Sequence, residues 1–148
     1  MRLEEIRNSV GRETGVSGWT EITQEMIDRF AQVSGDSQWI HVDVERARRE
    51  SPFGATVAHG FLTVSLLSRL SWDAAPVEGN FKLRVNYGFN KLRFPAPVVA
   101  GARVRAHMTP NAVRDVEGGV EIAWGVTVEI ENQAKPALAC EWLIRMYF

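Results

Sequence analysis

Two titratable residues, Asp36 and His41, lie five positions apart in the stretch SGDSQWIHVD, residues 34–43. A carboxylate and an imidazole that face one site can hold a water molecule and move its protons as a general acid and a general base. On an α-helix, five residues place side chains about 140° apart, and on a β-strand an odd separation places them on opposite faces. The two groups therefore meet only if the chain turns between them. Gly35 and Ser37, on either side of Asp36, are residue types that favour such a turn.

The first half of the chain has the pattern of helices that would position this pair. The segment TQEMIDRFAQVSG predicts a helix with Thr23 as its N-cap and Gly35 as its terminator. A short helix is expected from Asp43 through VERARRE, and it should stop before Ser51. The segment HGFLTVSLLSRLSW, residues 59–72, carries apolar side chains in almost every direction around a helix, which predicts a fully buried central helix.

The second half alternates apolar and polar residues with the period of half-buried antiparallel strands. This alternation runs through the segments ARVRAHM, VEIAWGVTVEIE and LACEWLIRMYF. The stretch DVEGGV between two of them predicts a hairpin turn, and Gly88 in the earlier run NFKLRVNYGFNKLRF predicts a bulge. The expected fold class is α+β, a single domain over residues 1–148 in which a curled antiparallel sheet wraps around the central helix.

Composition is that of an ordinary globular chain, with 45% hydrophobic residues, 24% charged residues and a net charge of −1. This charge gives no basic footprint for a nucleic acid. The charged start of the chain is unlike a signal peptide, and the longest apolar run is interrupted by Arg69 and too short to cross a bilayer. The single cysteine, Cys140, excludes an internal disulfide. We therefore expect a cytoplasmic protein with no nucleic-acid partner and no membrane insertion.

Three stretches, SGDSQWIHVD, FGATVAHGFLTVSLLSRL and VNYGFNKLRFPAPV, resemble the MaoC-like, R-specific enoyl-CoA hydratase family of hotdog-fold proteins. The resemblance runs from about Thr20 to Val99. It rests on an aspartate followed five residues later by a histidine, and on a downstream His-Gly pair that opens the central helix. Many family members have Asn-Pro between the aspartate and the histidine, where this chain has Gln38 and Trp39. This departure bears on substrate preference more than on the chemistry, because the spacing of the pair is kept.

The resemblance implies a single hotdog domain that adds water to trans-2-enoyl thioesters, or removes it from 3-hydroxyacyl thioesters. It assigns the water to Asp36 and His41 and the thioester oxygen to the backbone N–H of Gly60, where a helix N-terminus favours negative charge. The sequence leaves open which of the two side chains is the base. No cofactor is implied beyond the coenzyme A or acyl-carrier group of the substrate. Single-hotdog members of the family pair, so we expect a homodimer, which would also cover the exposed sheet edge.

Side chains near these residues are candidates to line the acyl pocket: Trp39, Phe53, His59, Phe61 and Ser65. His59 is interpreted as structural, with its imidazole hydrogen-bonded near the helix start. The histidines and Asp43 lack the spacing of metal ligands, so no metal site is expected. The basic residues of ERARR, namely Arg46, Arg48 and Arg49, are interpreted as a solvated helix face, with a contact to a coenzyme A phosphate as the alternative.

Two other functions compete with a hydratase. A hotdog acyl-CoA thioesterase would also activate water beside a helix N-terminus, but such enzymes usually place a carboxylate on or beside the central helix, and GFLTVSLLSRL contains no Asp or Glu. A non-catalytic acyl-CoA-binding hotdog protein would have no need of Asp36, His41 and Gly60 together.

Overall fold

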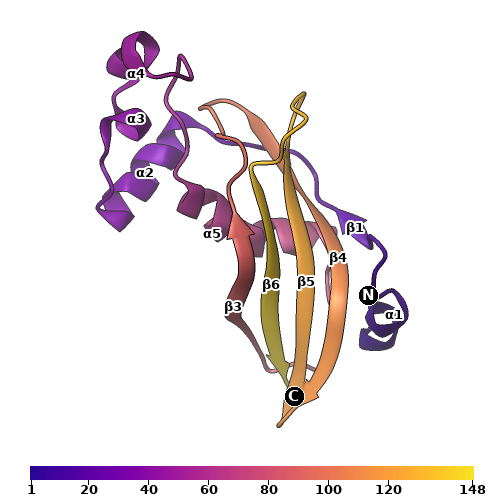
Figure 1. Ribbon diagram of the computed structural model, residues 1–148. Helices are drawn as coiled ribbons and strands as arrows, with labels where there is room; N and C mark the ends of the chain where they lie inside the picture. Colours follow the sequence, from indigo (N-terminus) through magenta and orange to yellow (C-terminus); the bar gives the residue numbers. More distant parts are fainter.

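A computed structural model, which describes all residues from 1 to 148, contains one antiparallel sheet with a long helix across one of its faces (Figure 1). The four long strands are β3 (Leu83–Arg93), β4 (Arg103–Val116), β5 (Gly119–Ile130) and β6 (Leu138–Tyr147). The short strands are β1 (Gly15–Val16) and β2 (Thr20–Glu21). The order across the sheet is β1-β4-β5-β6-β3, with β2 also paired to β4. The predicted α+β class with a curled antiparallel sheet is confirmed.

The two edges of the sheet differ. At one edge, β1 and β2 both pair with β4 and cover part of its outer side. At the other edge, β3 pairs only with β6, so its second side has no partner within the chain. A bare strand edge presents a row of unpaired N–H and C=O groups, which favours pairing with a further strand.

The turns within the sheet follow the local sequence signals. The predicted hairpin joins β4 to β5, and Gly118 adopts a left-handed φ of 70° there. The predicted bulge is confirmed in β3, where the register with β6 shifts between Asn86 and Gly88. A second register shift lies between Asn90 and Arg93, where no glycine in the sequence indicated a bulge.

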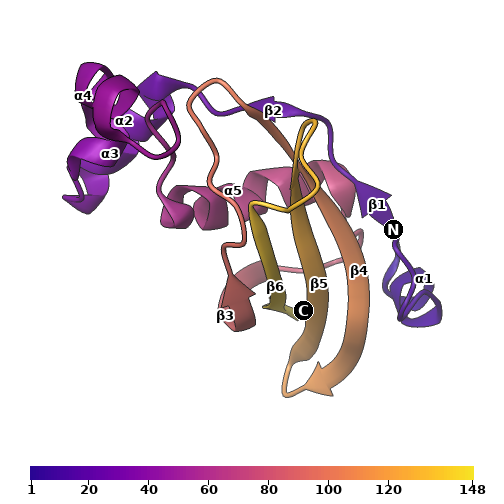
Figure 2. The same ribbon diagram turned by 45° about the horizontal axis from the view of Figure 1, so that its top comes forward.

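Five helices complete the fold (Figure 2). They are α1 (Leu3–Asn8), α2 (Gln24–Ser34), α3 (Trp39–Val42), α4 (Val44–Glu50) and α5 (Gly60–Ala74). The helices α2, α3 and α4 gather at one end of the molecule, beside the start of α5, whereas α1 lies at the opposite end. The predicted cap of α2 is confirmed, because Thr23 accepts a hydrogen bond from the Met26 N–H at 3.2 Å. Asp43 caps α4 in the same way and accepts from the Arg46 N–H at 3.0 Å.

The core lies between α5 and the face of the sheet that it crosses, as the strand alternation predicts. On β6 every second residue is buried, and the same holds for the first half of β4. The large, fully buried side chains of β4, β5 and β6 include Met108, Trp124 and Trp142. The alternation of apolar and polar residues along the strands therefore gives the sheet one apolar face, and α5 covers this face.

The expectation that α5 is buried on all sides is wrong for the single chain. The helix buries one face, made of Leu62, Thr63, Leu67, Leu70, Ser71 and Ala74. On its other side, Phe61 is 71% exposed and Trp72 is 60% exposed. Ser65 and Arg69, which follow at helical spacing between them, are also exposed. A sheet on one side of a helix covers only that side, so this exposed stripe of α5, residues 61, 65, 69 and 72, has no cover within the chain.

The outer face of the sheet, opposite α5, carries an ion cluster around His107. The His107 Nδ1 is 2.9 Å from the Glu13 carboxylate and its Nε2 is 2.7 Å from that of Glu129, which also accepts from Arg105 at 2.6 Å. Partial burial lowers the pKa of His107, but the hydrogen bonds to Glu129 and Glu13 outweigh it and raise the pKa overall. Both ring nitrogens donate only when the imidazole is protonated.

We expect this cluster to make folding stability depend on pH. Because the pKa of His107 is raised in the folded state, its contribution is fully present below about pH 6.5, the unfolded-state value, and is lost as the pH rises through the folded-state pKa. The loss should be at most about 1 kcal/mol in the free energy of unfolding, since the cluster is partly exposed to solvent. Urea unfolding at a series of pH values across this range measures the decline in the free energy of unfolding. The decline should be absent in His107→Gln. An unchanged decline in that variant would contradict its assignment to His107.

None of the helices combines the length and the apolar composition that a membrane crossing requires.

Candidate active site

Asp36 and His41 face each other because the chain reverses between α2 and α3. Helix α2 ends at Gly35, whose left-handed φ of 76° turns the backbone out of the helix. The Gln38 N–H then donates to Asp36 Oδ1 at 3.3 Å, a side-chain turn that starts α3. As a result, Asp36 Oδ2 lies 4.0 Å from His41 Nε2. This separation is too long for a direct hydrogen bond, but one water molecule can lie within hydrogen-bonding distance of both atoms.

The proton on His41 is placed by its second nitrogen. His41 Nδ1 lies 2.6 Å from the Val57 carbonyl oxygen, which can only accept, so Nδ1 carries a proton. The neutral imidazole then presents a free acceptor at Nε2, on the side of Asp36. The His41 side chain is 10% exposed and that of Asp36 is 54% exposed. The carboxylate therefore meets solvent, with the imidazole behind it.

Gln24, the first residue of α2, holds the backbone around His41. Its Nε2 donates to the His41 carbonyl oxygen at 2.8 Å and to Asp28 at 2.8 Å, while its Oε1 accepts from Thr56 at 2.5 Å. Thr56 precedes Val57, whose carbonyl fixes the His41 ring. Gln24 was not predicted as a site residue, because nothing local in the sequence connects it to residues 41 and 56.

The N-terminus of α5 offers free backbone donors. Gly60 is the first residue of this helix, and neither its N–H nor that of Phe61 donates to an acceptor in the chain. The first amides of a helix lack intrahelical partners and lie at the positive end of its dipole. This is the arrangement that can stabilise a developing oxyanion.

Gly60 also forms part of the wall of a pocket of about 280 Å³. The pocket is lined by Phe53, Ala58, Gly60, Thr63, Phe94, Ala96, Pro97, Val98 and Ala137. A Cβ on Gly60 would lie only 3.0 Å from the Phe94 ring, so glycine allows this ring to approach the start of the helix. The lining is mainly apolar, as suits an acyl chain.

The other pocket candidates occupy different places. Phe53 lines the pocket beside Gly60. Trp39 instead packs under the Arg46 guanidinium, 4.3 Å from its ring centre, and His59 is buried against His41. Phe61 and Ser65 belong to the exposed stripe of α5 and do not line this pocket in the single chain. Of the lining residues, only Phe53 and Gly60 were expected from the sequence; Thr63, Phe94 and the small apolar residues beside them were not.

Asp36, His41 and His59 form a cluster whose possible ligand atoms lie within 4.8 Å of one another. Its geometry is poor for a metal ion. The two imidazoles stack, with centroids 3.8 Å apart and an angle of 24° between their planes. Nitrogen lone pairs lie in the ring plane, so stacked rings do not converge on one ion. The absence of a metal site stays a prediction from the sequence.

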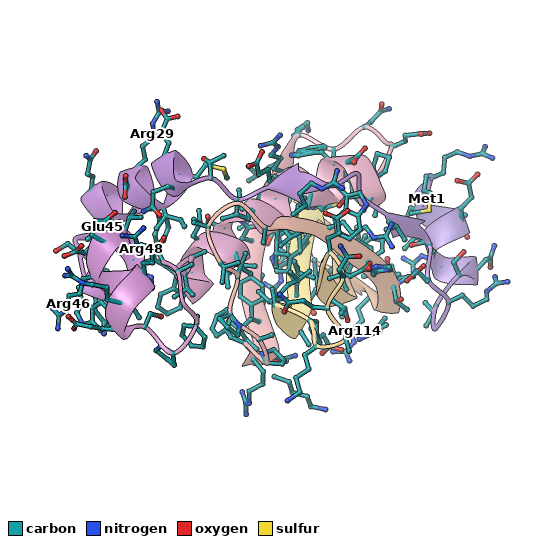
Figure 3. All side chains as sticks on the ribbon, turned by 90° about the horizontal axis from the view of Figure 1, so that it is seen from above. Met1, Arg29, Glu45, Arg46, Arg48 and Arg114 are labelled. Atoms are coloured by element: carbon teal, nitrogen blue, oxygen red, sulfur yellow. The ribbon has the colours of Figure 1, made fainter.

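The basic residues of α4 lie at the outer end of the molecule, where Figure 3 shows Arg46 and Arg48 beside Glu45. Arg46 bonds Glu50 at 2.8 Å and Arg48 bonds Glu45 at 2.8 Å. These pairs fit the solvated helix face that was expected from the sequence.

Comparisons with known proteins extend over almost the whole chain. Residues 5–132 match the family model described as MaoC like domain. A 3-hydroxyacyl-thioester dehydratase Z of Mycobacterium tuberculosis (strain H37Rv) is 48% identical over 144 residues, which cover 97% of this chain and 94% of the relative.

Two solved structures share the fold. A MaoC-like dehydratase from Rhodospirillum rubrum superposes with a TM-score of 0.80 at 20% identity, covering 99% of this chain and 97% of the other. An (R)-hydratase from A. caviae involved in PHA biosynthesis gives a TM-score of 0.68 at 23% identity, covering 90% of this chain and 96% of the other.

Proposed function

The chain belongs to the MaoC-like dehydratase family, and on that premise we propose that it is a hydro-lyase for acyl thioesters, which interconverts trans-2-enoyl and (R)-3-hydroxyacyl forms. Asp36 and His41 handle the water, and the Gly60 N–H binds the thioester oxygen. The observation that carries the proposal is the 4.0 Å approach of Asp36 Oδ2 to His41 Nε2, next to the helix start with its free amides. The name of the 48% identical relative, a 3-hydroxyacyl-thioester dehydratase, supports the substrate class.

The positions of the protons suggest the sequence of steps. The water oxygen bonds to C3 of the enoyl group, and one water proton passes to the free Nε2 of His41. The electron pair of the C2–C3 double bond moves toward C2 and the thioester oxygen, which becomes enolate-like. The proton on Nε2 then passes to C2, so that one water has been added and His41 is neutral again. Asp36 accepts the second hydrogen of the water in a hydrogen bond and orients its oxygen.

Binding of the thioester oxygen falls to the start of α5. The enolate-like oxygen gains negative charge only during the reaction, so a fixed donor at that position stabilises the transition state more than the substrate. The Gly60 N–H is such a donor, and Gly60 lines the apolar pocket together with Phe53 and Phe94. A neighbouring apolar pocket suits the acyl part of the substrate, with the charged coenzyme A or carrier group left toward solvent.

We also propose that the protein works as a homodimer joined along β3. The unpaired edge of β3 and the exposed stripe of α5 are both surfaces that a second copy would cover. A two-fold axis pairs identical strands antiparallel and buries the same surface on both copies. A second copy would then also cover Phe61 and Trp72, the large apolar side chains of α5 that the single chain leaves exposed.

An absorbance assay with a crotonyl-CoA-type enoyl thioester tests the reaction. We expect the absorbance of the conjugated enoyl group to fall without release of free thiol, and chiral analysis to identify the (R)-3-hydroxyacyl product. Release of thiol would instead indicate a thioesterase, which α5 does not favour: its one carboxylate, Asp73, lies in the last turn and bonds the Gly18 N–H. An (S) product, or no reaction across a range of chain lengths, contradicts the proposal.

A further inference from the structure

We propose that His59 is a positioning residue, which holds the Asp36 loop in register with the Gly60 amide through one hydrogen bond. The inference rests on the proposed function and deepens it, because it assigns the element that connects the acid–base pair to the oxyanion donor. His59 itself contacts neither reacting atom in this scheme and acts through Asp36 and His41.

His59 occupies a position where its side chain does not serve the helix. It is the N-cap residue of α5, yet its side chain makes no capping hydrogen bond. Ser, Thr, Asp and Asn are preferred at this position because their oxygens accept from the first free amides. An imidazole there gives up that stabilisation and leaves the Gly60 and Phe61 amides free. The side chain is therefore better explained by its contacts with other elements.

The contact that matters joins His59 to the backbone of Asp36. His59 Nε2 lies 2.8 Å from the Asp36 carbonyl oxygen, and since a carbonyl only accepts, Nε2 carries the proton. The other hydrogen bonds of the loop of residues 35–38 run only to its neighbours in sequence. The Gly35 N–H donates to the Ala31 carbonyl, the Asp36 N–H donates to the Ser34 hydroxyl at 3.2 Å, and the Gln38 N–H donates to the Asp36 carboxylate. The Gln38 carbonyl accepts from the His41 N–H. The His59 hydrogen bond is thus what connects this loop to the start of α5.

Packing fixes the His59 ring in the orientation that this bond needs. The residue is 3% exposed, and its ring stacks on His41 with centroids 3.8 Å apart, while Phe30 packs 5.0 Å away. Its second nitrogen, Nδ1, is buried without a hydrogen-bond partner. Buried polar atoms are usually paired, so this ring is held by its neighbours and by Nε2 alone.

The consequence is a direct connection between the two halves of the site. His59 and Gly60 are consecutive, so the side chain of one residue holds the carboxylate loop and the amide of the next faces the thioester. A shift of about 1 Å between such groups can lower a rate on the order of a hundredfold. Loss of the His59 hydrogen bond should therefore reduce kcat, while the acyl pocket and KM change little.

Two substitutions separate the hydrogen bond from the ring. His59→Gln keeps an N–H donor at about the position of Nε2 but has no ring, whereas His59→Phe keeps a ring but has no donor. We expect His59→Phe to lower kcat for enoyl hydration roughly tenfold to a hundredfold, and His59→Gln to stay within a few-fold of wild type. Amide hydrogen exchange at residues 35–38 should be faster than in the wild type in the phenylalanine variant and unchanged in the glutamine variant. Thermal unfolding measurements establish whether both variants fold. If His59→Phe does not fold, His59→Asn replaces it, because the asparagine amide is too short to reach the Asp36 carbonyl oxygen.

The outcomes are distinct. Equal losses in both variants, or a larger loss with glutamine, would show that the ring and not the donor matters and would overturn the inference. Unchanged kcat in His59→Phe would overturn it as well. If the wild-type protein hydrates no enoyl thioester, the proposed function fails, and the exchange of residues 35–38 still decides whether His59 holds this loop.

Discussion

Replacing Asp36 by Asn, or His41 by Ala, is expected to lower kcat for enoyl thioester hydration by roughly a hundredfold or more. Asp36→Asn removes the carboxylate that orients the water, and His41→Ala removes the Nε2 acceptor that takes its proton. The fold should survive the first change, because the Asp36 side chain is more than half exposed and bonds only the Gln38 N–H. KM should change less than kcat, because neither side chain lines the apolar pocket.

The chain supplies matched controls for these two substitutions. Asp43→Asn alters a carboxylate near the site that only caps α4, and asparagine caps as well as aspartate does. His107→Ala removes a histidine on the outer face of the sheet, away from the proposed site. Both controls should keep nearly full activity. Near-wild-type turnover in purified Asp36→Asn and His41→Ala would refute the assignment of the pair.

The protein should be a dimer of about twice the 16.6 kDa chain mass, and activity should depend on that state. Leu83 lies on the bare edge strand and is 55% exposed. Under two-fold pairing of β3, Leu83→Lys places a charge on each copy of the interface, next to Lys82 and Arg84, so repulsion should weaken the dimer. We expect the variant to shift toward the monomer in light scattering and to lose activity in parallel, with the loss reversed as concentration rises.

Val10 provides the comparison for this experiment. It is also an exposed apolar residue, at 44%, but it follows α1 near the covered edge of the sheet. Val10→Lys should leave both the molecular mass and the activity unchanged. A wild-type protein that light scattering reports as a monomer at assay concentration, with full activity, would rule out the dependence on a dimer.

Local signals in the sequence were enough to predict most of the fold. The helix between Thr23 and Gly35 was predicted at both ends, because a cap and a left-handed glycine are decided by neighbouring residues. The strands were predicted because alternation reflects burial on one face. The four-residue helix α3 was not predicted, since a single turn has no periodic pattern to detect. The buried state of α5 was predicted wrongly, because apolar composition does not reveal whether the covering surface belongs to the same chain.

In the candidate site, too, the local features could be predicted from the sequence and the long-range contacts could not. The spacing of Asp36 and His41 showed that they can meet only if the chain turns between them, and Gly35 indicated such a turn. The groups that orient His41 were not, because the Val57 carbonyl and the Gln24 amide reach it from segments 16 and 17 residues away in sequence. Such contacts depend on how α2, α3 and the segment before α5 pack together, and this information is absent from any short stretch of sequence.

The unequal edges of the sheet also limit how far copies of this chain can associate. A sheet with a bare strand at each of its two edges can add further copies at both edges and grow into a fibre. Here β1 and β2 pair with β4 only between Arg103 and Met108, so the second half of β4 has no strand partner on that side. The edge of β3 is bare along its whole length and is therefore the wider site for addition. Once two copies join through β3, each retains only the shorter, partly covered edge at β4, which makes further growth of the sheet less favourable.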